Sequence, residues 1–245
     1  MKPAVWNSFV KARERFRKEI KRLERNLPEL QALQQELVDN RTPRYTVETP
    51  VVYNTALDEI GPDSEIKLIL VGDNPGRREQ MAENRRYLIG PSGKIAEKFF
   101  RDNPSLGIDF RKNVIILNKT PVHTPRTADL RQLCRNFQEK LTESQQFMAR
   151  LLFEFHEAFA CDVWITGYCE LGKKGVFAPY TEELKAVYGK NSLKDAVFLY
   201  RHFSMNQFTV DLKRQAAGGG TPHKEPLTRT LNRIGTAYRE RFFEE

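Results

Sequence analysis

The sequence has few cysteines, and it lacks long apolar runs and the glycine-rich fingerprints of common nucleotide-binding enzymes. Its three cysteines, Cys134, Cys161 and Cys169, are odd in number and have no C-x-x-C spacing, which argues against a disulfide framework, a zinc site or an iron–sulfur cluster. No apolar run approaches the ~20 residues of a membrane span, and the N-terminus M-K-P-A-V-W has no signal-peptide core. We therefore expect a protein of the reducing cytoplasm with no membrane partner and no bound metal.

The missing glycine motifs also weigh against one class of function. No G-x-G-x-x-G follows a predicted strand, and G-x-x-x-x-G-K-[ST] occurs nowhere. A nucleotide-binding enzyme is therefore a weak third alternative to the functions considered below. The glycine run at 218–220 has no strand before it, so it is typical of a hinge or linker rather than of a phosphate cradle.

Positive charge is in excess. Lysine and arginine outnumber aspartate and glutamate by 40 to 32, giving a net charge of +8. This favours polyanionic partners, nucleic acid first, although many basic proteins bind none. Basic residues are dense in residues 1–45, where apolar residues at helical spacing predict two helices divided near Pro28. We interpret this segment as a basic helical N-terminal extension, whose cationic face is either solvated or in contact with phosphates.

Residues 46–245 alternate between predicted strands and helices and are expected to form one α/β domain. Short apolar runs rich in branched side chains predict buried strands at 66–71, 114–117, 162–166 and 196–200. Helical patterns lie at 93–100, at 128–160 in two parts, at 181–187 and at 226–243. This order predicts three α/β/α layers around a central four-stranded parallel sheet.

Two helix starts can be predicted from polar residues. Ser92 is the expected N-cap of the helix at 93–100. Thr142 with Gln145 resembles a capping box, which predicts that a new helix begins within 128–160.

Polar side chains follow three of the predicted strands. Asn74 lies just past the first strand, Asn118 ends the second, and His202 follows the fourth. Because parallel strands end at the same edge of a sheet, these side chains are expected to meet there. The sequence thus predicts a shared site at the C-terminal edge of the sheet.

Four motifs resemble, in order and spacing, those of the uracil-DNA glycosylase superfamily: G-D-N-P-G at 72–76, R-Y-L-I-G-P-S-G at 86–93, V-I-I-L-N at 114–118 and R-H-F-S at 201–204. The first is similar to the G-x-N-P-G of the mismatch-specific and single-strand-selective branches. The second is similar to the R-P-F-x-G-x-x-G loop of the thermostable branch. The resemblance spans roughly residues 65–210 and leaves out the N-terminal helices.

This resemblance implies that an extruded base lies at the C-terminal ends of the strands. By position, Asn74 matches the residue that positions or activates the hydrolytic water, and Asp73 is the alternative base. Asn118 matches the asparagine that reads the O4 and N3 edge of uracil. His202 matches the histidine that donates to uracil O2 as the base departs.

Further contacts are expected beside these residues. The remaining base-binding positions are Gly72, Pro75, Tyr87 and Leu88. The expected DNA-binding positions are Arg126, Arg201, Phe203, Ser204 and Met205. Two alternatives stay open: Phe203, Met205 and Phe208 either wedge into a base stack or pack their own loop, and His123 and Arg126 either touch a phosphate or are solvated. His156 is expected in the core.

The sequence also departs from the superfamily pattern. Leu88 replaces the stacking phenylalanine and Tyr87 the proline before it, so a base would be stacked weakly or by Tyr87. Phe203 replaces the proline after the histidine, and Asn74 is no strong general base. The four cysteines of the iron–sulfur branch are missing.

The residue types suit N-glycosidic cleavage. Negative charge builds on the departing base, and a preorganised neutral donor stabilises it. An amide matches uracil but meets reversed polarity in cytosine, at about 1–3 kcal/mol for each mismatched buried group. We therefore predict a monomeric DNA glycosylase of base excision repair, with no cofactor, that removes a deaminated base, most readily uracil, from DNA. The alternative is a nucleic-acid-binding protein on the same fold that does not cleave.

Overall fold

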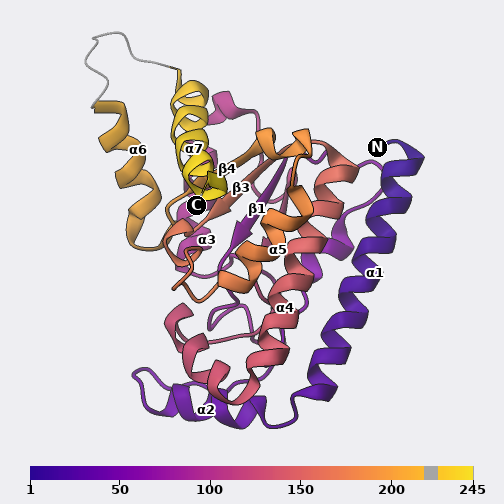
Figure 1. Ribbon diagram of the computed structural model, residues 1–245, viewed down its shortest axis with the longest axis vertical. Coiled ribbons are helices and arrows are strands. Elements are labelled where there is room, and N and C mark those ends of the chain that lie inside the picture. The colour runs from indigo at the N-terminus through magenta and orange to yellow at the C-terminus, as the bar shows by residue number, and fades with distance from the viewer. Residues whose placement is uncertain (218–225, 245) are drawn as a thin grey trace.

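Four short strands form a parallel sheet at the centre of the computed structural model, which describes residues 1–217 and 226–244 (Figure 1). The strands run in the order β2-β1-β3-β4 across the sheet. Only Asp162 among their residues is exposed, as expected for strands covered on both faces. The predicted α/β class and four-stranded parallel sheet are confirmed; the strands are β1 (Leu68–Gly72), β2 (Val114–Asn118), β3 (Asp162–Thr166) and β4 (Val197–Tyr200).

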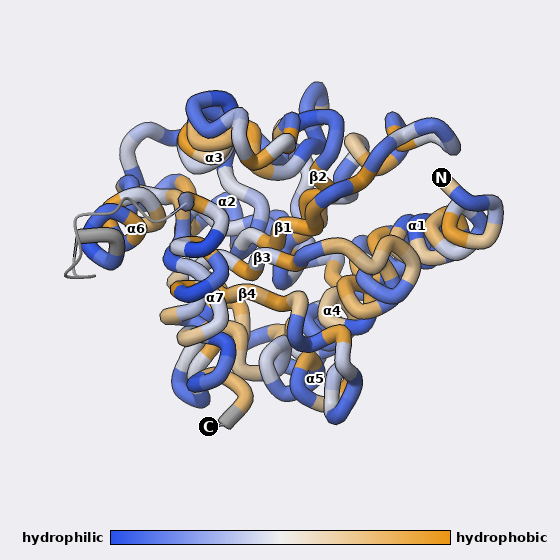
Figure 2. The backbone as a smooth tube through the Cα atoms, turned by 90° about the horizontal axis from the view of Figure 1, so that it is seen from above, coloured by the Kyte–Doolittle hydropathy of each residue, from blue (hydrophilic) through white to orange (hydrophobic). Residues whose placement is uncertain are grey.

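Helices cover both faces of the sheet, which lies between them as an apolar layer (Figure 2). On one face, α3 (Pro91–Asp102) stacks Phe100 on Trp164 of β3, with ring centroids 5.5 Å apart. The other face is covered by α4 (Leu130–Phe159) and α5 (Ala178–Tyr188). The chain then adds α6 (Gln207–Ala217) and α7 (Leu227–Glu244), the latter packed along β4. This arrangement is consistent with three α/β/α layers.

Two predicted helix starts are wrong. The helix α3 begins at Pro91 with Gly90 as its N-cap, not at Gly93 with Ser92 as the cap, because proline fits the first helical position, where no N–H donor is needed. Thr142 lies inside α4, so it caps no helix; the helix is interrupted earlier, at Phe137, by the backbone angles φ −132° and ψ 32°. The glycine run at 218–220, expected as a hinge or linker, lies outside the described residues.

The N-terminal helices share the core of the sheet. The first, α1 (Pro3–Asn26), lies along α4, and α2 (Leu30–Asp39) follows it (Figure 1). Apolar residues spaced three to four apart on α1 are buried in the same hydrophobic cluster as the strands: Phe9, Ala12, Phe16, Ile20 and Leu23. The basic extension is therefore packed onto the α/β domain.

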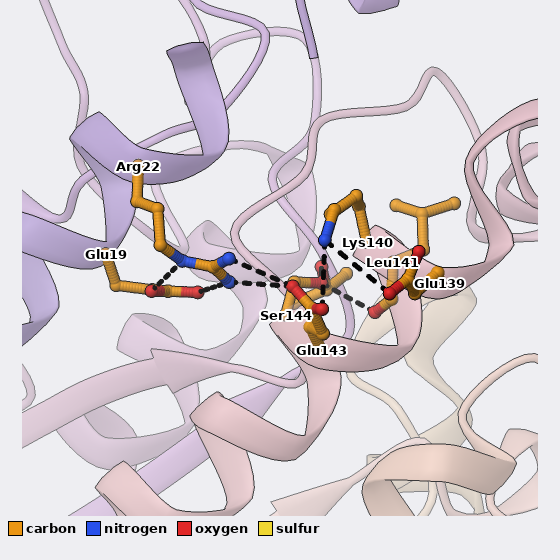
Figure 3. A network of polar contacts seen from close by, with 8 residues as sticks. Glu19, Arg22, Glu139, Lys140, Leu141, Glu143 and Ser144 are labelled. Atoms are coloured by element: carbon orange, nitrogen blue, oxygen red, sulfur yellow. Dashed lines mark hydrogen bonds and ion pairs between the residues drawn. The ribbon is translucent and has the colours of Figure 1, made fainter. Parts of the chain in front are cut away.

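Acidic partners neutralise several arginines of α1. Arg22 binds Glu19 at 2.7 Å and Glu143 of α4 at 3.0 Å, and Lys140 extends this network (Figure 3). Arg17 pairs with Asp58 at 2.5 Å, and Arg15 pairs with Glu154. These ion pairs favour the first interpretation of the basic extension, a solvated cationic face on a packed helix. They argue against phosphate binding by these side chains. Among the described residues, no helix is both long and apolar enough to cross a membrane.

Truncation of Phe16 tests whether α1 is an integral part of the core. Its ring is fully buried, with centroids 5.3 Å from Tyr53 and 6.3 Å from Phe147. We expect Phe16→Ala to lower the free energy of unfolding by about 3–5 kcal/mol in urea titrations. Val210→Ala, at a side chain in α6 that is 59% exposed, should change it by less than about 0.5 kcal/mol. A loss for Phe16→Ala as small as the control's would contradict a shared core.

Candidate functional site

A pocket of about 590 Å³ opens at the C-terminal edge of the sheet. Because β1 lies between β2 and β3, the strand order reverses at β1. Open α/β sheets bind ligands at the carboxyl ends of the strands beside such a reversal. Asn74, Asn118 and His202 all line the pocket, so the three predicted side chains do meet. Other lining residues are Asp73, Gly76, Arg77, Arg78, Glu79, Met81, Glu83, Asn84, Leu88, Gly90, Pro91, Ser92 and Thr127. Within the described chain, no group of three or more His, Cys, Asp and Glu side chains is arranged to hold a metal.

The side-chain amide of Asn118 is buried, and its nitrogen has no partner among the described residues. Its side chain lies over Gly72, where an added Cβ would come 2.7 Å from Asn118 Oδ1. The residue is 2% exposed, yet Asn118 Nδ2 has no hydrogen-bond partner in the part of the chain that is described. A buried donor left unpaired costs roughly 1–3 kcal/mol. Asn118 also lines the pocket, so a ligand that brings a carbonyl oxygen to Nδ2 would remove this cost.

Two threonines hold the amide of Asn74 in one orientation. Asn74 Nδ2 donates to Thr124 Oγ1 at 2.8 Å, and Thr127 Oγ1 donates to Asn74 Oδ1 at 3.0 Å. The amide oxygen keeps a second lone pair, which can accept from a water molecule. Both threonines belong to the loop after β2, and the sequence gives no signal for their role.

Lys119 is a further residue that sequence reasoning missed. Its fully buried ammonium donates to Asp73 Oδ1 at 2.5 Å and to the carbonyl oxygen of Thr166 at 2.5 Å. Gly167, with φ +79°, leaves room for this carboxylate, because a Cβ there would lie 2.5 Å from Asp73 Oδ1. One signal was present in the sequence. Lys119 directly follows Asn118, the end of a predicted strand, so it is expected at the same sheet edge as Asp73.

His202 is a neutral hydrogen-bond donor. The backbone N–H of Ser204 donates to His202 Nδ1 at 3.0 Å, so the imidazole proton resides on Nε2. Burial lowers the pKa of His202; the charge of Asp73 opposes this shift, and that of Lys119 adds to it. An Nε2–H group therefore lies in the same pocket as Asn118 Nδ2.

The expected base-binding residues divide into two sets. Leu88 lines the pocket with φ +50°, while the preceding Tyr87 is fully buried behind the wall. Tyr87 donates its hydroxyl to the Val52 carbonyl at 2.6 Å, so the idea that it stacks on a base is wrong. Pro75 is also buried and outside the lining, and Gly72 is the floor beneath Asn118. The left-handed turn at Leu88 separates two neighbouring side chains in a way that the sequence did not reveal.

The expected DNA-binding residues do not form one surface. Phe203 is fully buried and stacks on Phe208, with centroids 4.4 Å apart, so both rings pack the loop rather than form a wedge. Met205 is 85% exposed and is the one free apolar tip among these three residues. Arg201 lies 3.8 Å from Asp211. Arg126 is exposed, and Ser204 contacts His202 through its backbone N–H.

Two buried residues, His123 and Glu79, make hydrogen bonds that hold the loop after β1. His123 Nδ1 contacts the Pro75 carbonyl at 2.8 Å and Nε2 contacts Tyr45 Oη at 3.1 Å, while burial lowers the pKa of His123 to about 4. The alternatives of a phosphate contact and a solvated loop are therefore both wrong for His123. Glu79 accepts from the Gly76 N–H at 2.9 Å; burial raises the pKa of its carboxyl, and nearby backbone N–H groups at 88–90 oppose that shift. His156 lies in the core, as expected, beside Tyr188 Oη at 2.7 Å.

A methyl group on Gly72 tests the close contact with Asn118. We expect Gly72→Ala to lower the free energy of unfolding by about 1–3 kcal/mol, because Asn118 must move from its packed position. Gly76→Ala is the matched control, since nothing lies within 4 Å of a Cβ there, and it should have an effect below about 0.5 kcal/mol. The double variant Gly72→Ala/Asn118→Ala should be less destabilised than the two single effects added together. Equal losses for Gly72→Ala and Gly76→Ala would contradict the contact.

The tautomer of His202 can be measured directly. With its pKa below the ordinary value of 6.5, the ring should be neutral at pH 7 and take up its proton only as the pH falls further. Two-dimensional ¹⁵N NMR of histidine-labelled protein should report a protonated Nε2 and an unprotonated Nδ1, with the signals assigned by their loss in His202→Gln. A doubly protonated ring at pH 7, or a proton on Nδ1, would contradict the hydrogen bond from Ser204.

Comparison with known proteins leaves the family open. No family model, curated protein or solved structure matches the chain. The motifs at 72–76, 86–93, 114–118 and 201–204 and the geometry of the pocket are therefore what any functional assignment must be argued from.

Proposed function

We propose that the protein is a DNA glycosylase that hydrolyses the N-glycosidic bond of a deaminated base, uracil first. One observation carries the proposal: Asn118, whose Nδ2 donor has no partner among the described residues, and His202, whose proton resides on Nε2, line one pocket at the C-terminal edge of a parallel sheet. A base with two carbonyl groups offers both of them acceptors. The order β2-β1-β3-β4 and the four motifs are compatible with the glycosylase fold that the proposal requires.

The two sides of the pocket suit the two charges of the reaction. As the N-glycosidic bond breaks, negative charge collects on the base, where the neutral donor of His202 stabilises it. Positive charge collects on the sugar, where the carboxylate of Asp73 can stabilise it. Asn74 Oδ1 and Asp73 Oδ2 both approach Thr127 Oγ1, at 3.0 and 3.5 Å. A water molecule held between these oxygens is positioned to attack the sugar.

Cations at the pocket entrance suit a DNA strand. Arg77 and Arg78 are exposed residues of the pocket lining, and Arg126 is exposed on the loop after β2. Phosphate contacts from such side chains make binding dependent on salt. A base in a duplex must be flipped out at a cost of a few kcal/mol, and the exposed Met205 follows His202 closely enough to fill the space left behind.

A second candidate is a nucleic-acid-binding protein that does not cleave. Leu88 supplies no aromatic face for stacking, and Asn74 is a weak base, so binding without turnover is compatible with the same pocket. Salt-dependent DNA binding is common to both candidates, and only turnover separates them.

A cleavage assay distinguishes these candidates. Labelled oligonucleotides would carry uracil, hypoxanthine or xanthine, single-stranded or mispaired, and abasic products would be revealed by alkali. We expect cleavage of the uracil strand and a loss of about 10²–10³-fold in kcat/KM for His202→Ala and for Asn118→Ala, because each removes one preorganised donor. Asn74→Ala tests the water-binding side. Asn26→Ala, at the exposed end of α1, is the amide control and should cleave like the wild type.

One result would contradict the proposed enzymatic activity. Salt-dependent binding of all these oligonucleotides, with no alkali-sensitive product from any of them, would leave the binding protein as the better description. Loss of cleavage in Asn26→Ala as well would show that the substitutions act through folding.

A further inference from the structure

We infer that Lys119 is a positioning residue of the site: its buried ammonium holds one carboxylate oxygen of Asp73 and leaves the other toward the pocket that His202 also lines. The inference deepens the proposed function and rests on it for the effect on cleavage. The electrostatic part can be measured without any reaction.

The ammonium of Lys119 is enclosed at the edge of the sheet. It is fully buried, it donates to Asp73 Oδ1 and to the Thr166 carbonyl, and the Gly72 carbonyl lies 3.4 Å away. The ring of Phe177 covers it, with the centroid 5.0 Å from Nζ. Asp73 is the one carboxylate paired with it among the described residues. A buried cation needs such a partner, because removing one member of the pair leaves an uncompensated charge.

The ion pair with Lys119 gives the two carboxylate oxygens of Asp73 different roles. Oδ1 is occupied by Lys119 and lies in the space that the missing Cβ of Gly167 leaves. Among the described residues, Oδ2 has a single weak contact, with Thr127 Oγ1 at 3.5 Å. Oδ2 is therefore the oxygen that is free to accept a hydrogen bond from a water molecule or to face a cationic sugar.

His202 is the second group affected by the charge of Lys119, which lowers the pKa of its imidazole. The Asp73 carboxylate favours the protonated imidazole, and the Lys119 ammonium opposes it. Without Lys119, the effect of Asp73 would remain unopposed by this cation, and it favours the protonated imidazole. A protonated His202 would no longer be the neutral donor that the proposed reaction uses.

Four other charged side chains belong to the pocket lining. Arg77, Arg78, Glu79 and Glu83 come from the loop after β1 and line the same pocket. They contribute two positive and two acidic side chains. Burial is the main cause of the lowered pKa of His202, and the charged groups that shift it further are Asp73, which raises it, and Lys119, which lowers it.

Four variants test this role. Lys119→Met keeps the length of the stem and removes the charge, Asp73→Asn removes the opposite charge, and the double variant removes both. Lys112→Met is the control, because Lys112 is exposed. Histidine ¹⁵N NMR would follow the protonation midpoint of His202 in each. We expect the midpoint to rise by about one pH unit in Lys119→Met, since a nearby cation is gone. It should fall in Asp73→Asn and return close to the wild-type value in the double variant.

Cleavage and thermal melting add two further readouts. Lys119→Met should lose roughly 10–100-fold in kcat/KM, as expected for a misplaced catalytic group, with the largest loss at the acid end of the pH profile. The double variant should melt at a higher temperature than Lys119→Met, because no unpaired charge stays buried, and it should still cleave poorly. Lys112→Met should match the wild type in all three measurements.

Three outcomes would overturn the inference. The first is an unchanged His202 midpoint in a folded Lys119→Met; if that variant does not fold, an unchanged midpoint in Asp73→Asn has the same meaning. The second is cleavage restored in the double variant. The third is a covalent adduct with DNA that borohydride traps and that Lys119→Met abolishes, because it would make Lys119 a nucleophile. Midpoints that shift as expected in a protein that cleaves nothing would support the charge arrangement and reject the proposed function.

Discussion

The ion pair between Lys119 and Asp73 sets a constraint on everything around it. An ammonium buried this deeply is stable only where a carboxylate and several carbonyl dipoles converge on it. Here the carboxylate follows β1, the lysine follows β2, and a carbonyl comes from the last residue of β3. Three strand ends are thus held at fixed distances by one charged group. The pocket lies directly on this junction, so its dimensions depend on the register of the sheet.

Around the ion pair, uncharged contacts fix the rest of the pocket. Thr124 and Thr127 hold Asn74, Ser204 holds His202, and Gly72 provides the space that Asn118 occupies. Among the described residues, Asn118 Nδ2 is left without a partner, and Asn74 Oδ1 keeps a second lone pair. A site of this kind is prepared in advance for a ligand with matching donors and acceptors, which is how protein dipoles act most strongly on a reacting group.

The sheet could be predicted from the sequence because buried parallel strands are nearly continuous apolar runs. The meeting of Asn74, Asn118 and His202 followed from the topology alone, since parallel strands end at one edge. The contacts of Lys119 could not be predicted in this way. They depend on side-chain rotamers and on the path of two loops, neither of which has a pattern in the sequence.

Local rules failed where packing decided the outcome. Tyr87 and Leu88 are neighbours, yet a left-handed turn at Leu88 puts one in the core and the other in the pocket. Thr142 has the residues of a helix start, but the helix passes through it. Phe203 was expected either at a DNA surface or in its own loop, and the aromatic cluster with Phe208 places it in the loop.

The burial of Phe203 and Phe208 has a consequence for the exposed residue between them. Met205 projects from a short turn with φ +53°, anchored on both sides by rings in the core. A loop that is already ordered loses little conformational entropy when it contacts a partner. A partner that contacts Met205 would therefore meet an ordered turn. Most of the free energy gained by burying its apolar side chain would contribute to affinity, because little conformational entropy would be lost in ordering the loop.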